Sequence, residues 1–169
     1  MLPLLVIAAI SSLAAAAGAA RPRRAGWTIP QLAAYWARRR GLPTVWVLAT
    51  IAVESGGTVD EVGDGGISIG LMQINSRAHA ARLARLGFTR ESLFDPDTNI
   101  MMGTQILREA YDRVREALAG RTASSPIDVL TRLVYKGYPV ASVIREGAGL
   151  DLHSTARWQA ALVKSTALV

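Results

Sequence analysis

Glu54 stands where a carboxyl group could act as a general acid. Val47, Ile51 and Glu54 fall on one stripe of a predicted helix, so the carboxyl group ends an apolar face just before a glycine-rich stretch. Partial removal from water disfavours the charged form and raises a carboxyl pKa, which a proton donor working near neutral pH requires. A solvated glutamate near a helix end is the plainer interpretation of this position taken alone.

Three acidic residues of the following stretch could supply a second carboxyl group: Asp60, Glu61 and Asp64. Retaining and inverting glycosidases need such a partner, either as nucleophile or as the base that activates water. Asp64 is the candidate, and it would serve a hydrolase if it faced Glu54 across a cleft. The structural interpretation of all three is that they are solvated loop acids.

Two further segments follow Glu54-Ser55 in order: Gly70–Asn75 (GLMQIN), and Phe94–Gly103, which contains Phe-Asp-Pro, Asn-Ile and a final glycine. With these three markers, the chain from about residue 30 to about residue 140 resembles the lytic transglycosylase family. It is most similar to the short phage and conjugation-associated members, in which Ser-x-Gly-Leu-Met-Gln-Ile-Asn is typical. The resemblance implies a lysozyme-like fold and an activity on peptidoglycan.

The same resemblance implies the reaction. Glu54 would protonate the β-1,4 glycosidic oxygen between N-acetylmuramic acid and N-acetylglucosamine, and would then act as base on the muramic 6-hydroxyl. The product is a 1,6-anhydro sugar, and neither a second carboxylate nor a cofactor is needed. Two alternatives stay open: a lysozyme-type hydrolase that uses Asp64, and an inactive wall-binding or virion structural protein on the same fold.

The resemblance also suggests residues that bind the glycan. Ser68, Gln73 and Asn75 would hydrogen-bond the sugar, since they match polar positions of the family's second marker. The family's usual Ala-Tyr-Asn-x-Gly segment reads Val-Tyr-Lys-Gly-Tyr here, without the asparagine. Tyr135 is the candidate for the tyrosine that contacts the glutamate or the substrate, with Tyr138 in reserve, and either tyrosine could instead belong to the core.

Helices must position these residues. Thr28 and Gln31 form a capping-box pattern at the start of a first helix. Pro43 is expected in the first turn of a second helix that ends near Glu54. The stretch 56–70 is too rich in glycine for a helix and predicts a loop or a short hairpin, to which irregular or weakly β structure is confined.

The rest of the chain also reads as helical. A helix is expected over 77–86, and the apolar spacing over 97–118 predicts a core helix, capped by Asp95 and opened by Pro96. Further helices are expected from about Ser125 and about Ser154. Met72 and Ile74 are expected in the core. The fold class is therefore mainly α, an α+β lysozyme-like helical bundle around a glycan-binding cleft.

Composition narrows the chemistry. The chain has no cysteine, which excludes disulfides, zinc–thiolate sites and cysteine nucleophiles. His79 and His153 share no metal-ligand spacing, so neither a metal nor a cofactor is expected. The net charge of +6 favours an anionic partner such as nucleic acid, a phospholipid surface or a wall polymer. No motif interleaves aromatic and basic residues, which argues against nucleic acid.

Residues 1–24 form an apolar leader that ends in the basic run Arg21, Arg23 and Arg24. A cleaved signal peptide, a retained membrane anchor and a virion-embedded helix all fit this segment. Residues 25–169 form the expected catalytic domain, which would act outside the cytoplasm on the cell wall. Its expected partners are peptidoglycan strands, together with a membrane, a virion or a secretion complex contacted through the leader.

Overall fold

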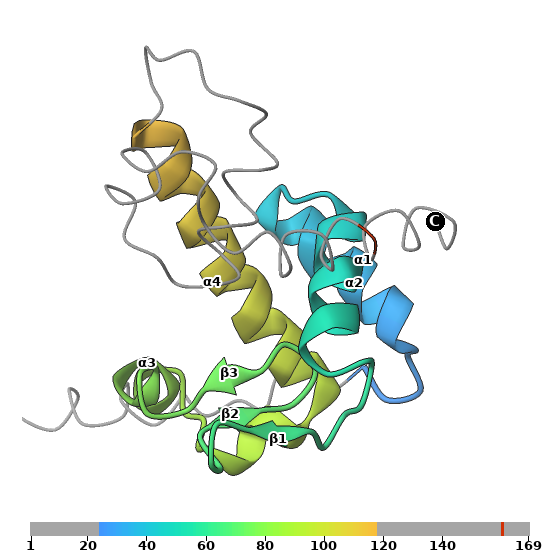
Figure 1. Ribbon diagram of the computed structural model, residues 1–169. Coiled ribbons are helices and arrows are strands. Elements are labelled where there is room, and N and C mark those ends of the chain that lie inside the picture. The colour runs from blue at the N-terminus through green and yellow to red at the C-terminus, as the bar shows by residue number, and fades with distance from the viewer. Residues whose placement is uncertain (1–23, 118–159, 161–169) are drawn as a thin grey trace, which may run out of the picture.

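The computed structural model describes residues 24–117 and residue 160 (Figure 1). This part of the chain is mostly helical with one small antiparallel sheet, which confirms the expected α+β lysozyme-like class. The elements, in order, are α1 (Ile29–Arg40), α2 (Thr44–Glu54), β1 (Val62–Gly63), β2 (Ser68–Ile69), β3 (Ile74–Asn75), α3 (Ala80–Arg85), a 3-10 helix (Glu91–Phe94) and α4 (Pro96–Ala117).

Helix α1 begins at the predicted capping box. The Thr28 amide donates to Gln31 Oε1 at 2.8 Å, and the Gln31 amide donates to Thr28 Oγ1 at 3.4 Å. The helix ends at Gly41, whose φ of 61° is left-handed and suits glycine. Its inner face is buried and consists of Leu32, Ala33, Trp36 and Ala37.

Helix α2 is mostly apolar, and its middle turns, residues 47–51, are buried. The structure places Pro43 at the N-cap, in an extended conformation, one position before the first turn where the sequence suggested it. Because α2 carries no other ionisable side chain, Glu54 is the one charge-bearing residue at the end of a hydrophobic helix.

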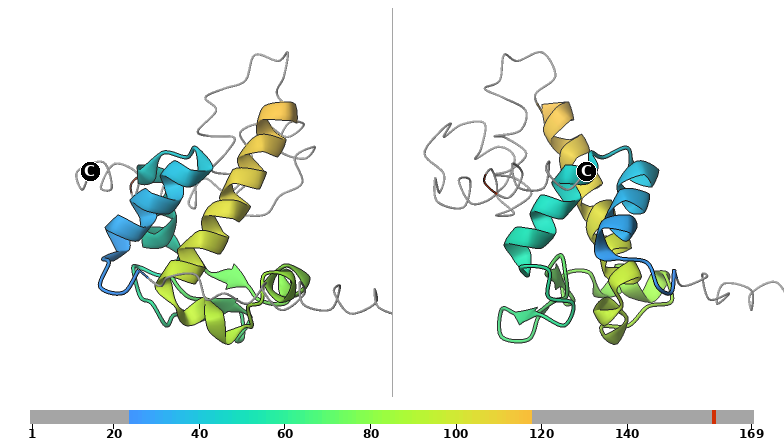
Figure 2. Two further views of the ribbon diagram at one scale, coloured as in Figure 1. Left: turned by 180° about the vertical axis from the view of Figure 1, so that it is seen from behind. Right: turned by 90° about the vertical axis from the view of Figure 1, so that its right-hand side faces the viewer.

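Helix α4 is the longest described helix, with 22 residues, and it spans about 33 Å at 1.5 Å per residue. It starts at Pro96, and Asp95 Oδ1 accepts a hydrogen bond from the Thr98 amide at 2.9 Å, so the predicted cap is confirmed. Helix α4 packs against α1, β3 and the 3-10 helix, and the sheet and α3 lie near the end where α4 begins (Figures 1 and 2).

The sheet has the strand order β1-β2-β3, and both pairs are antiparallel. The hairpin predicted within 56–70 is confirmed, but the expectation that β structure stops there is wrong, since β3 extends the sheet to Asn75.

Helix α3 is shorter than predicted. Asn75 Oδ1 accepts from the Ala78 amide at 2.8 Å, which turns the chain before the helix can begin at Ala80.

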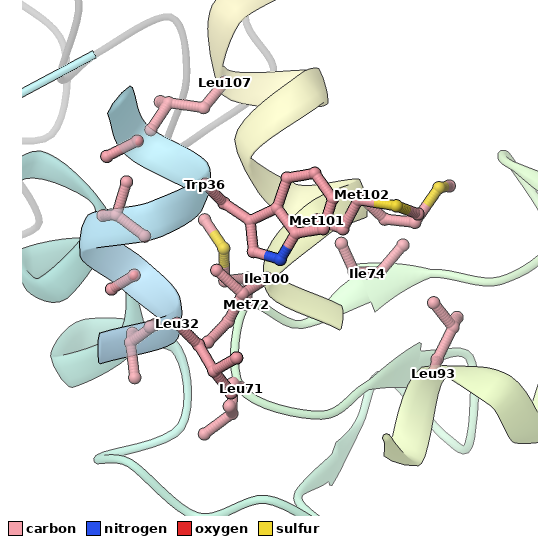
Figure 3. Close-up of a cluster of buried hydrophobic side chains, with 14 of the residues drawn as sticks. Leu32, Trp36, Leu71, Met72, Ile74, Leu93, Ile100, Met101, Met102 and Leu107 are labelled. Atoms are coloured by element: carbon pink, nitrogen blue, oxygen red, sulfur yellow. The ribbon is translucent and has the colours of Figure 1, made fainter. Parts of the chain in front are cut away.

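One apolar core joins the helices to the sheet region (Figure 3). Met72 and Ile74 are buried in it, at 8% and 3% exposure, as the sequence predicted. The helices expected from about Ser125 and Ser154 lie outside the described residues. No helix within the described part of the chain has the length and hydropathy needed to span a membrane.

Candidate active site

Glu54 is the last residue of α2, and its side chain is half-buried. The chain then leaves the helix through Gly56 and Gly57, whose φ angles of 62° and 89° favour glycine. The carbonyl groups at a helix C-terminus carry a partial negative charge, and the last turn of α2 holds no basic residue to offset it. Glu54 is therefore a partly buried carboxyl group at the negative end of a helix.

Ser55 fixes the end of α2 to the Gly70–Gln73 segment. Its Oγ donates to the Leu71 carbonyl at 2.9 Å and also lies 3.2 Å from the Ile51 carbonyl within α2. The Gly57 amide donates to the same oxygen at 3.2 Å. The backbone next to Glu54 is therefore held in register with the second sequence marker.

Asn99 holds the backbone of the second marker in place through hydrogen bonds. It lies in the first turns of α4 and is 1% exposed. Its Oδ1 accepts from the Met72 amide at 2.9 Å, and its Nδ2 donates to the carbonyls of Ile69 at 2.9 Å and Leu93 at 2.8 Å. One buried amide thus satisfies three backbone groups from three segments, as buried polar groups require.

Two glycines allow this close packing. A Cβ on Gly70 would lie 2.7 Å from the Leu93 carbonyl oxygen and would overlap the Asn99 amide, and the φ of Gly70 is 75°. A Cβ on Gly103 would lie 2.9 Å from the Met72 Cβ. The glycines of the second and third markers therefore serve the approach of α4 to the Gly70–Gln73 segment.

Gln73 closes the loop over the sheet. Its backbone is left-handed, with a φ of 44°, and its Nε2 donates to the carbonyls of Gly70 at 2.9 Å and Glu61 at 3.2 Å. Its Oε1 lies beside Gly63, which leaves no room there for a Cβ. Both amide hydrogens thus hold the protein backbone, and a contact of Gln73 with the sugar stays a prediction.

Asp64 lies at the tip of the β1–β2 hairpin and is exposed. Its Oδ2 accepts a hydrogen bond of 2.5 Å from Ser68 Oγ. Among the described residues other than glycine, only Asp64 and Gln73 have a positive φ. Such backbone strain concentrates at functional sites, and here both strained residues are ones that the sequence singled out.

The structure brings most of the predicted polar residues to one sheet. Ser68 on β2 pairs with Asn75 on β3, and the two side chains are cross-strand neighbours. Ser68 is buried, whereas Asn75 is exposed. The predicted tyrosines, Tyr135 and Tyr138, lie outside the described residues, so their relation to Glu54 is not part of this geometry.

His79 lies half-buried where α3 begins. Burial lowers its pKa from the usual 6.5, the positive charge of Arg82 lowers it further, and Glu109 opposes the change. Within the described part of the chain no three His, Asp or Glu side chains cluster in a way that could hold a metal ion.

The sequence model of the Transglycosylase SLT domain family matches residues 31–131, which is more than half of the chain. The chain belongs to this family. The match contains Glu54 and all three sequence markers, and its first part corresponds to the fold from α1 to α4. A comparison with curated proteins gives no match.

Members of this family are peptidoglycan lytic transglycosylases, which are lyases that act on the cell wall. This transglycosylase therefore binds peptidoglycan, as the sequence predicted. Sequence reasoning missed two parts of the site, the Ser55 link to Leu71 and the three bonds of Asn99. Both residues belong to the markers, but their partners are brought together only by the fold.

Proposed function

We propose that the enzyme cleaves the bond between N-acetylmuramic acid and N-acetylglucosamine and leaves a 1,6-anhydro muramic end, with Glu54 as its catalytic residue. The placement of Glu54 carries this proposal. It is the single ionisable side chain of α2, half-buried at the negative end of the helix, and Ser55 holds the adjacent backbone. A carboxyl group in such surroundings is suited to proton donation.

The reaction balances without water. The Glu54 carboxyl proton passes to the glycosidic oxygen while the bond from that oxygen to the muramic C1 breaks, with positive charge developing on the sugar. The muramic 6-hydroxyl oxygen then bonds to C1 and gives its proton to the Glu54 carboxylate. The acid is restored, and an intramolecular hydroxyl replaces the second carboxylate of ordinary glycosidases.

Substrate contacts are proposed for Ser68, Gln73 and Asn75, and for Tyr135 with Tyr138 in reserve. Gln73 would act through Oε1, since its amide hydrogens bind backbone carbonyls. Asn75 is exposed and would act through its Nδ2 group, since its Oδ1 accepts a hydrogen bond from the Ala78 amide in the following turn.

The proposed division of the chain is a catalytic domain over residues 25–169 and a leader over residues 1–24. The leader would deliver the enzyme to the envelope, outside the cytoplasm. Its setting would be a phage particle or a secretion or conjugation machine, where local opening of the wall is needed.

The test compares the full chain with its Glu54→Gln variant on purified peptidoglycan sacculi, with mass spectrometry of the released muropeptides. We expect 1,6-anhydro ends from the wild type and about a thousandfold slower release from the variant, because general acid–base catalysis is lost. Glu91→Gln is the control, since this exposed glutamate is not one of the candidate carboxyl groups and should be replaceable without loss. Equal release by wild type and Glu54→Gln would refute the role of Glu54.

A lysozyme-type hydrolase is the second candidate, and the strained backbone of Asp64 with its bond to Ser68 favours it. In a hydrolase Asp64 would activate water or act as nucleophile, and the products would carry reducing ends. Asp64→Asn separates the two reactions in the same assay. We expect this variant to keep releasing anhydro ends, whereas a hydrolase would lose its activity.

A further inference from the structure

Positive charge is concentrated at one end of the sequence. The first 53 residues contain six arginines and none of the 13 acidic residues, so the other 116 residues carry basic and acidic groups in equal number. Three of the six arginines, Arg38, Arg39 and Arg40, form the last turn of α1. The excess charge of the protein therefore lies on α1 and on the segment before it.

Helix α1 buries one face and leaves the other at least partly exposed. Leu32, Ala33, Trp36 and Ala37 pack into the core, and the opposite side of the helix is exposed or half-exposed. Trp27 precedes the helix on this side and is 44% exposed. We call this side the α1 outer face, and it consists of Trp27, Gln31, Ala34, Tyr35, Arg38 and Arg39.

Two aromatic rings and two arginines lie together on the α1 outer face. The rings of Trp27 and Tyr35 meet edge to face at 5.7 Å, and the Arg39 guanidinium lies 5.6 Å from the Tyr35 ring and donates to its hydroxyl. Aromatic rings with a polar edge, combined with long basic side chains, are typical of surfaces at a membrane–water interface.

Within the described part of the chain, no salt bridge joins Arg38 or Arg39 to a carboxylate. Asp97 is bonded to Arg24 and to the indole of Trp36, and Asp112 is bonded to Arg108. Arg38 and Arg39 are exposed at the end of the helix. The α1 outer face therefore presents positive charge to an approaching surface.

Arg24 fixes where the apolar leader meets the domain. Its Nη1 lies 2.8 Å and 3.1 Å from the two carboxylate oxygens of Asp97, and its guanidinium lies 3.7 Å from the centre of the Tyr35 ring. Residues 21–23 separate Arg24 from the apolar segment 1–20 and span at most about 10 Å. A bilayer that holds the apolar segment must therefore lie within reach of Arg24, which is at the Trp27 end of the α1 outer face.

We propose that the α1 outer face binds the surface of a bilayer that contains anionic phospholipid. The arginines bind headgroup phosphates, for which the guanidinium group is suited, and Trp27 lies at the boundary with the acyl chains. The helix then lies along the membrane surface.

Because the chain has no cysteine, single labels can test this placement in the full-length protein. Ala34→Cys on the α1 outer face and Ala84→Cys on the exposed side of α3 each receive an environment-sensitive fluorophore. The probes used are vesicles of phosphatidylcholine, alone or mixed with phosphatidylglycerol. We expect a blue shift and stronger emission at position 34 only, with the anionic vesicles only, and reversal by high salt.

A pair of double variants separates the face from the leader. Arg38→Gln with Arg39→Gln should weaken the membrane contact at position 34 about thirtyfold, at roughly fivefold per arginine. Co-sedimentation of the chain through residues 1–20 should persist. Arg77→Gln with Arg85→Gln removes two exposed arginines from elsewhere on the surface and should change nothing at position 34.

Several results would overturn the proposal. These are equal responses at positions 34 and 84, no response at 34 while the chain co-sediments, a response that both lipid mixtures produce equally, and failure of the full chain to bind vesicles. A response at position 34 to purified sacculi but not to vesicles would also refute membrane binding. It would indicate that the α1 outer face binds a wall polymer.

Discussion

The helical frame of α1, α2 and α4 and the sheet region of residues 55–79 are held together in different ways. The frame rests on many apolar contacts shared over three helices. The sheet region also contributes residues to this core, but its strands have two residues each and depend in addition on side chains that bond backbone groups: Ser55, Gln73, Ser76 and Asn99. Substitution of a frame residue should therefore lower stability without changing one particular part of the site. Removal of a single hydrogen bond in the sheet region can instead change the shape of the site.

The largest effect is expected for Asn99→Ala. This substitution leaves the Met72 amide and the Ile69 and Leu93 carbonyls buried without their partner. Each unsatisfied group costs about 1–3 kcal/mol, so we expect a loss of about 4 kcal/mol in the free energy of unfolding. Urea denaturation measures this loss, and turnover of sacculi per folded molecule should fall as well, because the Gly70–Gln73 segment loses its support.

Leu107→Ala is the matched change in the frame, where Leu107 is 2% exposed. A buried leucine replaced by alanine costs about 3 kcal/mol, close to the expected cost of Asn99→Ala. Turnover per folded molecule should stay at the wild-type value, since the frame residue bonds no group of the site. If both variants lost turnover in equal proportion, the two regions would not differ as we describe.

The helical frame was predictable because helices have caps and a regular spacing of apolar residues. Thr28 caps α1, Asp95 caps α4, and the apolar spacing over 97–118 gives α4 within a residue at either end. Such signals are local, since a cap or an amphipathic stripe is decided by residues three or four positions apart. The leader and the part of the chain after residue 117 carry predictions of the same kind that lie outside the described residues.

The sheet region was predictable only in outline. Glycines over 56–70 indicated a turn-rich segment, but β3 lies beyond them. It pairs with β2 through backbone groups, and such pairing produces no recognisable pattern of residue types in the sequence. The roles of Asn99 and Ser55 likewise depend mainly on partners 16 to 30 positions away. The resemblance to transglycosylases located these residues, but it did not reveal what they bond.

A second pair of variants tests the tight contact between the two regions. Gly70 and Gly87 have almost the same φ, 75° and 74°, so alanine carries a similar left-handed backbone penalty of about 1 kcal/mol at both positions. At Gly70 the new Cβ also meets the Leu93 carbonyl and the Asn99 amide, whereas Gly87 has open space. We expect Gly70→Ala to cost about 3 kcal/mol in urea denaturation and Gly87→Ala about 1 kcal/mol. Equal costs would show that the contact yields without strain.

A smaller stability effect and a selective loss of rate are expected for Ser55→Ala. Its hydroxyl links α2 to the Leu71 carbonyl, and a net hydrogen bond contributes about 1 kcal/mol. Because the link positions the backbone beside Glu54, kcat should fall roughly ten- to hundredfold with KM nearly unchanged. Thr50→Val is the control on the same helix, since the Thr50 hydroxyl bonds only the Trp46 carbonyl one turn away. A kcat loss in the control as large as that in Ser55→Ala would remove the positioning role.

The smallest effect concerns pH, at the point where α3 meets α4. Burial and then Arg82 lower the pKa of His79 below 6.5, so the folded protein favours the neutral imidazole. Below pH 6.5 the unfolded chain takes up this proton more readily than the folded one. The stability contribution of His79 is therefore present above that pH and is lost as the pH falls toward its folded pKa.

Urea denaturation of the wild type and of His79→Gln, at neutral and at mildly acidic pH, should show the excess stability of the wild type shrinking on acidification. A constant difference between the two proteins would mean that the surroundings of His79, including Glu109, hold its pKa at the unfolded value.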